Sequence, residues 1–158
     1  MLVPSAEIEK HPFVATKSYS PLEESFTVAY FLGLFDGLKE DGKLTAKPFL
    51  ISKPGITGLG NGCLQDILFA ARLHPRHRIA ALDETEKLRL YEAIRAVLRQ
   101  AVEQGGRDSE EDLFGRPGGY LKVLDARSVG QPCPRCGETI QKESYMGGTV
   151  YFCPACQK

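Results

Sequence analysis

The sequence predicts a mainly α-helical protein that ends in a small β-hairpin ribbon. Apolar residues recur at the 3.6-residue spacing of helices in several segments before residue 105. Near the C-terminus, two Cys-x-x-Cys pairs flank two short stretches typical of β-strands. The hydrophobic share of 42% is ordinary for a globular protein and argues against wholesale disorder.

Four helices are expected before the cysteine region. The longest has a clear start signal, because Asp83 followed three residues later by Glu86 is a capping-box pattern. Gly105 and Gly106 are expected to end it. The helix before it should stop near His74, because the ring of Pro75 disfavours helical geometry in the residue that precedes it. The expected helices cover residues 25–38, 45–51, 61–72 and 83–104.

These patterns divide the chain into three regions. Residues 1–20 mix Pro, Ser, Glu and Lys without periodicity, so we expect a linker or an extended arm there. Residues 21–115 should form a helical domain, and residues 116–158 a glycine-rich connector and the cysteine ribbon. We expect no signal peptide and no membrane span, and hence a cytoplasmic location. The 20 basic residues balance the 20 acidic ones, so net charge neither indicates nor excludes a nucleic-acid partner.

The cysteines of the ribbon have the spacing of zinc ligands. Zinc prefers four tetrahedral ligands, and two residues between cysteines let one knuckle deliver two thiolates to the same ion. Two disulfides or free thiols are the alternatives, and a reducing compartment disfavours the disulfides. With four protein ligands, no position is left for a catalytic water, so the sequence predicts one structural Zn²⁺. Its ligands are Cys133, Cys136, Cys153 and Cys156, around strands expected at residues 139–145 and 149–152 with a turn at Gly147-Gly148.

A glycine-rich turn comes directly before the third expected helix. Gly58 and Gly60 would let an anion approach the backbone, and the first amides of a helix bind phosphate well. The Asn61 side chain could donate a further hydrogen bond, and Lys53 could reach the same phosphate. A tight turn with Asn61 as an ordinary N-cap is the alternative. The basic segment 72–78 is likewise open between a phosphate contact and a solvated loop.

In this order, the features resemble the C-terminal half of the formamidopyrimidine-DNA glycosylase and endonuclease VIII family. The resemblance rests on Gly58-Leu59-Gly60-Asn61, residues 68–75, the capped helix, the Gly115–Tyr120 connector and the four cysteines, and it covers about residues 20–158. It implies a helix–two-turns–helix domain followed by a zinc ribbon, both gripping duplex DNA around a damaged nucleotide. It also implies that Asn61 is a phosphate ligand and that the cysteines bind zinc.

The chain departs from the family's pattern at three places. Gly148 stands where the ribbon turn usually carries a phosphate-contacting arginine, and Cys63 stands where an aromatic residue is usual. Cys63 itself is expected to be a small buried residue. The family also attacks the damaged nucleoside with the amine of an N-terminal proline, on a β-sandwich domain. Pro4 provides no Pro-Glu opening of that kind.

The resemblance therefore implies the DNA-binding half of a base-excision repair glycosylase and AP lyase, truncated and inactive by itself. Two alternatives remain. The chain could be an active glycosylase or AP lyase when a separate catalytic domain joins it. It could instead be a protein-interaction adaptor, a role that suits a zinc ribbon without the arginine.

Overall fold

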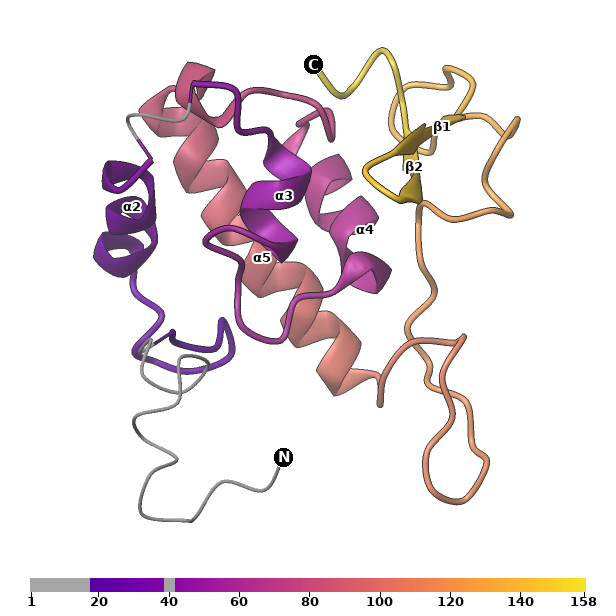
Figure 1. Ribbon diagram of the computed structural model, residues 1–158. Coiled ribbons are helices and arrows are strands. Elements are labelled where there is room, and N and C mark those ends of the chain that lie inside the picture. Colours follow the sequence, from indigo (N-terminus) through magenta and orange to yellow (C-terminus); the bar gives the residue numbers. More distant parts are fainter. Residues whose placement is uncertain (1–17, 39–41) are drawn as a thin grey trace.

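The computed structural model describes residues 18–38 and 42–158, and it forms a helical body with a ribbon docked on one side (Figure 1). The predicted arm at residues 1–20 lies almost wholly outside the described residues. The helices are α2 (Val28–Asp36), α3 (Ala46–Ile51), α4 (Asn61–Ala71) and α5 (Glu84–Glu103), with a 3₁₀ turn at Ile79–Ala81. Strands β1 (Gln141–Tyr145) and β2 (Gly148–Phe152) form the ribbon hairpin. The predicted fold class is confirmed.

The long helix α5 starts and ends where the sequence indicates. The Asp83 carboxylate accepts a hydrogen bond of 2.8 Å from the Glu86 backbone N–H, and the Glu86 carboxylate accepts one of 3.0 Å from the Asp83 N–H. This capping box satisfies amides that the first helical turn leaves unpaired. At the other end, Gly105 and Gly106 adopt φ values of +74° and +101°, which only glycine adopts readily.

The helical core lies between α5, α4 and an aromatic cluster from the N-terminal part. Phe26 stacks on Tyr91 with ring centroids 5.6 Å apart, and Phe31 packs against both rings. Helix α4 contributes side chains with no exposed surface at Leu64, Ile67 and Leu68. Burying each such side chain stabilises the fold by about 1.5–3 kcal/mol. Helix α4 is thereby fixed in the body, and every element docked on α4 is fixed with it.

Several element boundaries differ from the predicted ones by up to three residues, and two of these differences have a clear local reason. Helix α2 begins at Val28 rather than residue 25, because the Thr27 hydroxyl caps it by accepting a 3.1 Å hydrogen bond from Tyr30 N–H. The hairpin turn lies at Met146-Gly147, one residue earlier than predicted, with φ values of +50° and +72°. Positive φ at both central residues is the geometry of a tight hairpin turn. Gly148 therefore belongs to β2, where it pairs with Tyr145.

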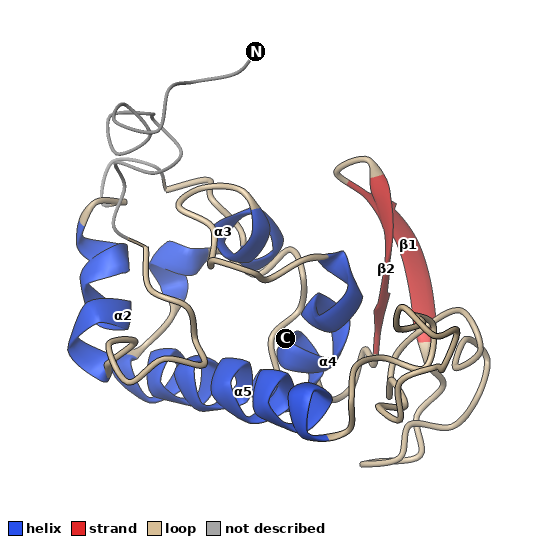
Figure 2. Ribbon diagram, turned by 90° about the horizontal axis from the view of Figure 1, so that it is seen from below, coloured by secondary structure: helices blue, strands red, loops and turns tan. Residues whose placement is uncertain are grey.

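Figure 2 shows the hairpin standing beside α4 at one side of the helical body. Within the described residues, no helix combines the length and the apolar character needed to cross a membrane.

Candidate metal centre and nucleic-acid interface

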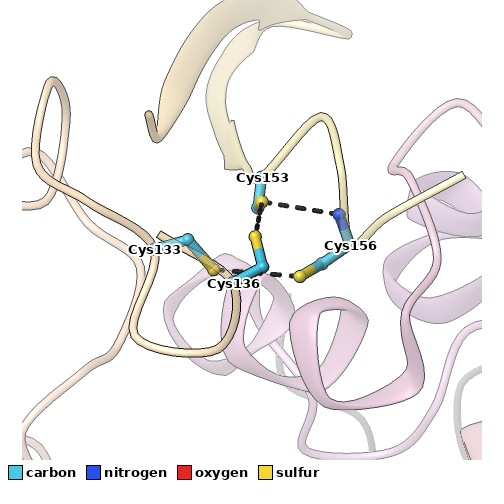
Figure 3. A group of neighbouring side chains, drawn as sticks. All are labelled: Cys133, Cys136, Cys153 and Cys156. Atoms are coloured by element: carbon cyan, nitrogen blue, oxygen red, sulfur yellow. Dashed lines mark hydrogen bonds between the residues drawn. The ribbon is translucent and has the colours of Figure 1, made fainter. Parts of the chain in front are cut away.

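The four ribbon cysteines converge on one point (Figure 3). Their sulfur atoms all lie within 4.8 Å of one another. Cys133 Sγ is 3.8 Å from Cys156 Sγ, and Cys136 Sγ is 3.5 Å from Cys153 Sγ. These distances are far too long for disulfides. They fit thiolates around one ion, because a tetrahedral site with Zn–S bonds of about 2.3 Å places sulfurs about 3.8 Å apart. The predicted zinc site is thus assembled by the fold.

Backbone geometry holds the sulfurs in place. The Arg135 N–H points at Cys133 Sγ and the Cys156 N–H at Cys153 Sγ, each over 3.4 Å. Such N–H groups stabilise thiolate charge. After the first knuckle, Gly137 adopts a φ of +81°, a conformation that glycine adopts readily. The donor set of four thiolates suits zinc in a closed, structural role.

The zinc ribbon is bound to α4 along the length of that helix. Gln65, 4% exposed, accepts a hydrogen bond from Tyr151 N–H (3.2 Å) and donates one to the Thr149 carbonyl (3.4 Å). At the far end of α4, Arg135 donates to the Phe69 carbonyl over 2.9 Å, and its guanidinium lies 4.3 Å from the Phe69 ring centroid. Contacts at Gln65 and Phe69 therefore fix the ribbon against α4.

The basic segment 72–78 supports this docking instead of lying free in a loop. Arg76 stacks on the Tyr145 ring at 4.0 Å from its centroid and forms a 2.6 Å ion pair with Glu143. His74 packs edge-on against Phe152 at 4.4 Å, and burial lowers the pKa of its imidazole. The hairpin contacts of Arg76 and His74 argue against a free solvated loop, whereas the phosphate contact of this segment stays a prediction. Both side chains contact the hairpin.

The glycine turn leads into α4 as the sequence predicts. Gly58 adopts a φ of +76°, and Gly60 is the N-cap residue of the helix. Asn61 is the first residue of α4 and is exposed, and its side chain does not cap the helix, so the ordinary N-cap alternative does not apply to it. The first amides of α4 therefore have no side-chain cap of their own, and they lie at the positive end of the helix dipole.

Two nitrogen-bearing side chains meet at Gly148 on the hairpin. A Cβ atom added at Gly148 would lie 3.4 Å from Lys47 Nζ and 3.7 Å from Asn61 Nδ2. The start of α4, helix α3 and the hairpin turn therefore converge there, although Lys47 of α3 and Tyr145 of the hairpin are 98 residues apart in sequence. An ammonium, an amide and the start of a helix form a group suited to binding phosphate oxygens.

Sequence reasoning missed Lys47. The residue is only 3% exposed, and its ammonium donates a 2.6 Å hydrogen bond to the Tyr145 carbonyl. Burial lowers the pKa of Lys47 below its usual 10.5. A signal was available, since Lys47 is the one charged residue in the short helix Ala46–Ile51. A lysine at a buried position needs a specific partner.

Two other expected residues lie elsewhere. Lys53 is exposed in the loop after α3, outside the group that converges at Gly148, so its phosphate contact stays a prediction. Cys63 is half-buried rather than buried as expected, because it lies at the edge of the helical core and lines a cleft beside the glycine turn. Burial raises the pKa of its thiol, in keeping with a structural role.

A buried carboxylate fixes the connector to α4. Asp66, 4% exposed, accepts hydrogen bonds from Tyr120 OH (2.8 Å), Val123 N–H (3.0 Å) and Leu124 N–H (2.8 Å). Burial raises the pKa of this carboxyl, against the opposing effect of the three donors. Asp66 thus fixes the end of the connector and the residues that follow it, and Gln65 fixes strand β2.

Two known protein families match most of the chain. Residues 18–112 match the family described as the formamidopyrimidine-DNA glycosylase H2TH domain, and residues 130–158 match the zinc finger found in FPG and IleRS. The formamidopyrimidine-DNA glycosylase of Thermus thermophilus is 35% identical over 151 residues, which is 92% of this chain and 55% of that protein. That of Pelotomaculum thermopropionicum is 34% identical over 163 residues, 99% of this chain and 56% of that protein.

Solved structures agree with these matches. The MutM (Fpg) protein from Thermus thermophilus superposes with a TM-score of 0.77 at 35% identity, covering 94% of this chain and 56% of that one. The Lactococcus lactis Fpg in complex with DNA that contains an abasic site gives a TM-score of 0.79 at 27% identity, covering 98% and 55%. The chain spans about half the length of the relatives that it matches.

Proposed function

Because the chain belongs to the formamidopyrimidine-DNA glycosylase H2TH family, we propose that it binds duplex DNA through phosphates. The proposed ligands are the first turn of α4 with Asn61, the glycine turn at Gly58 and Gly60, and Lys47. The zinc ribbon holds the hairpin over this group. In this proposal the chain is not catalytic by itself, and damaged duplex DNA is its partner.

One observation carries the proposal: Lys47 and Asn61 meet at Gly148. Each could be a structural side chain if it stood alone. Together they present a cation and an amide donor beside a helix start, and the hairpin lies against them. A phosphate lying there would contact the helical body and the ribbon hairpin at once. Contacts of this kind position a protein on the DNA backbone without reading the base sequence.

The zinc site supports this arrangement through the hairpin. The ribbon core is small and consists mainly of Phe69 from α4, Leu124, Cys133, Ile140 and Cys153. Zinc binding supplies on the order of 10 kcal/mol to modules of this size. Single hydrogen bonds to the hairpin, such as those of Gln65 and Lys47, contribute only about 0.5–1.5 kcal/mol each and would not replace the ion. The metal thus has a structural role in DNA binding. We also propose a cytoplasmic location, because a reducing compartment keeps the four thiols available for zinc.

A salt titration tests DNA binding. Fluorescence anisotropy with a labelled duplex, at several salt concentrations, should show affinity that falls steeply as salt rises. Lys47→Gln should reduce the slope of log K against log salt by about 0.9, the value for one phosphate contact. The matched control is Lys142→Gln, the same charge change at an exposed position on β1. Equal effects of the two substitutions, or a wild-type affinity independent of salt, would overturn the proposal.

Borohydride trapping on abasic DNA tests the lack of activity. Reduction would fix any imine between an amine of the chain and the opened sugar as a covalent adduct. We expect no adduct with this chain alone. A trapped adduct would instead support the enzymatic alternative. A stable protein partner together with no DNA binding at low salt would support the adaptor alternative, which the glycine at position 148 favours.

A further inference from the structure

The loop after α5 returns one side chain to the start of α4. Arg107 follows Gly105 and Gly106, and its guanidinium lies against the backbone of Gly62 in the first turn of α4. A Cβ atom at position 62 would overlap the Arg107 guanidinium. Glycine at position 62 is therefore required for this contact. The Arg107 side chain is 24% exposed, so it is largely enclosed at the edge of the glycine turn.

A guanidinium at this place needs a negative partner. The start of α4 is the positive end of its dipole, so a cation there raises the electrostatic energy unless an anion accompanies it. Glu110 is that anion. Its carboxylate accepts a 3.1 Å hydrogen bond from Arg107 Nε and a second, short one from Nη2. This is the two-point geometry in which arginine also binds phosphate.

The Glu110 carboxylate can be replaced on Arg107 by another anion. Its side chain is 55% exposed, and the pairing with Arg107 is the main reason that its pKa is lowered. An ion pair with a solvent-exposed carboxylate contributes little net stability, because water competes for that carboxylate. Beside the pair lies an open cleft of about 550 Å³, lined among others by Gly58, Gly60 and Leu98. An incoming phosphodiester has room to approach the guanidinium from that cleft.

We propose that Glu110 is an autoinhibitory anion, which occupies Arg107 until a DNA phosphodiester displaces it. The inference rests on the proposed DNA-binding function and adds a second cationic ligand, Arg107, in addition to Lys47 at the start of α4. In the free chain, the Arg107 fork is satisfied by Glu110. In the complex, it pairs with phosphate, and the Glu110 carboxylate returns to water. Glu110 thereby lowers the affinity of the chain for DNA. Only an anion that enters the cleft can displace Glu110 and bind Arg107.

Charge-matched variants of the full chain test the proposal by anisotropy with a labelled duplex. Glu110→Gln should bind more tightly than Glu111→Gln by up to about fivefold, the upper end of the effect of removing one solvent-exposed pair. Both variants change the net charge equally, and Glu111 is an exposed neighbour without the Arg107 contact. Glu110→Asp keeps the charge but shortens the side chain, so it should also tighten binding, by a smaller factor. Arg107→Gln should weaken binding and abolish the gain from Glu110→Gln in the double variant.

The outcomes separate the two proposals. Equal affinities of Glu110→Gln and Glu111→Gln, or wild-type affinity of Arg107→Gln, would overturn the autoinhibitory contact alone, provided that Asn61→Ala still weakens binding. Wild-type protein that binds no duplex at low salt would overturn both proposals. Zinc content and thermal melting of each variant show whether it is folded. If Glu110→Gln melts early, Glu110→Asp carries the comparison, because it retains the carboxylate.

Discussion

Placing an arginine on the ribbon turn should strengthen DNA binding. Gly148 has no positive φ, so the backbone at this position accepts any L-residue. The added Cβ would lie 3.4 Å from Lys47 Nζ and 3.7 Å from Asn61 Nδ2, distances that small shifts of these flexible ends accommodate. The new guanidinium would then reach the phosphate that Lys47 and Asn61 are proposed to bind. A charge-assisted hydrogen bond to phosphate is worth about 1.5–3 kcal/mol, so Gly148→Arg should tighten binding by a factor of about ten or more.

The salt dependence distinguishes a phosphate contact from a general charge effect. One more neutralised phosphate should steepen the slope of log K against log salt by about 0.9. Ser144→Arg is the matched control, because it adds the same charge at an exposed position on β1 of the same hairpin. Its slope should change less. If Gly148→Arg and Ser144→Arg have the same affinity and the same slope in anisotropy titrations, the proposed position of the phosphate is wrong.

Three further perturbations have defined outcomes. Cys153→Ser removes one of four thiolates, so elemental analysis should show loss of the bound zinc, while circular dichroism should retain most of the signal of the separately packed helical core. Asp66→Ala leaves three donors without their acceptor, and urea unfolding should show a loss of about 3–5 kcal/mol. Because burial lowers the pKa of Lys47, DNA affinity should fall as pH rises toward 10.5, and wild-type protein should lose more affinity than Lys47→Gln does. In the same window the unfolded chain binds more protons at this lysine, so this group's contribution to stability rises with pH. A pH-independent difference between the two proteins would contradict the role of the ammonium.

Local sequence patterns were sufficient where the determining interactions are local. The capping box of Asp83 and Glu86, the glycine end of α5 and the two cysteine knuckles each depend on residues within a few positions of one another. The hairpin was found as well, but its turn was misplaced by one residue. Gly147-Gly148 satisfies the preference for glycine in turns, yet the pairing of Tyr145 with Gly148 places Met146 in the left-handed region instead.

The site at the start of α4 depends on contacts that local sequence patterns do not encode. Asn61 was identified from the glycine turn before it, whereas Lys47 and Gln65 were not identified. Lys47 acts on the Tyr145 carbonyl 98 residues away, and Gln65 binds the backbone of β2 at Tyr151, 86 residues away. No pattern within a short window encodes such separations, because they result from how the ribbon packs on α4.

The sequence alone determined that the chain has capped helices, a glycine turn before a helix and four thiolates spaced for one zinc ion, because each depends on near neighbours or on a metal's fixed geometry. Only the tertiary structure decided that Lys47, Asn61 and Gly148 meet, and that Arg107 lies against Gly62 with Glu110 as its partner. Those arrangements depend on packing between segments that are distant in sequence. Leu68 is buried in the helical core and its neighbour Phe69 in the ribbon core, so helix α4 sets the position of the ribbon relative to the other helices.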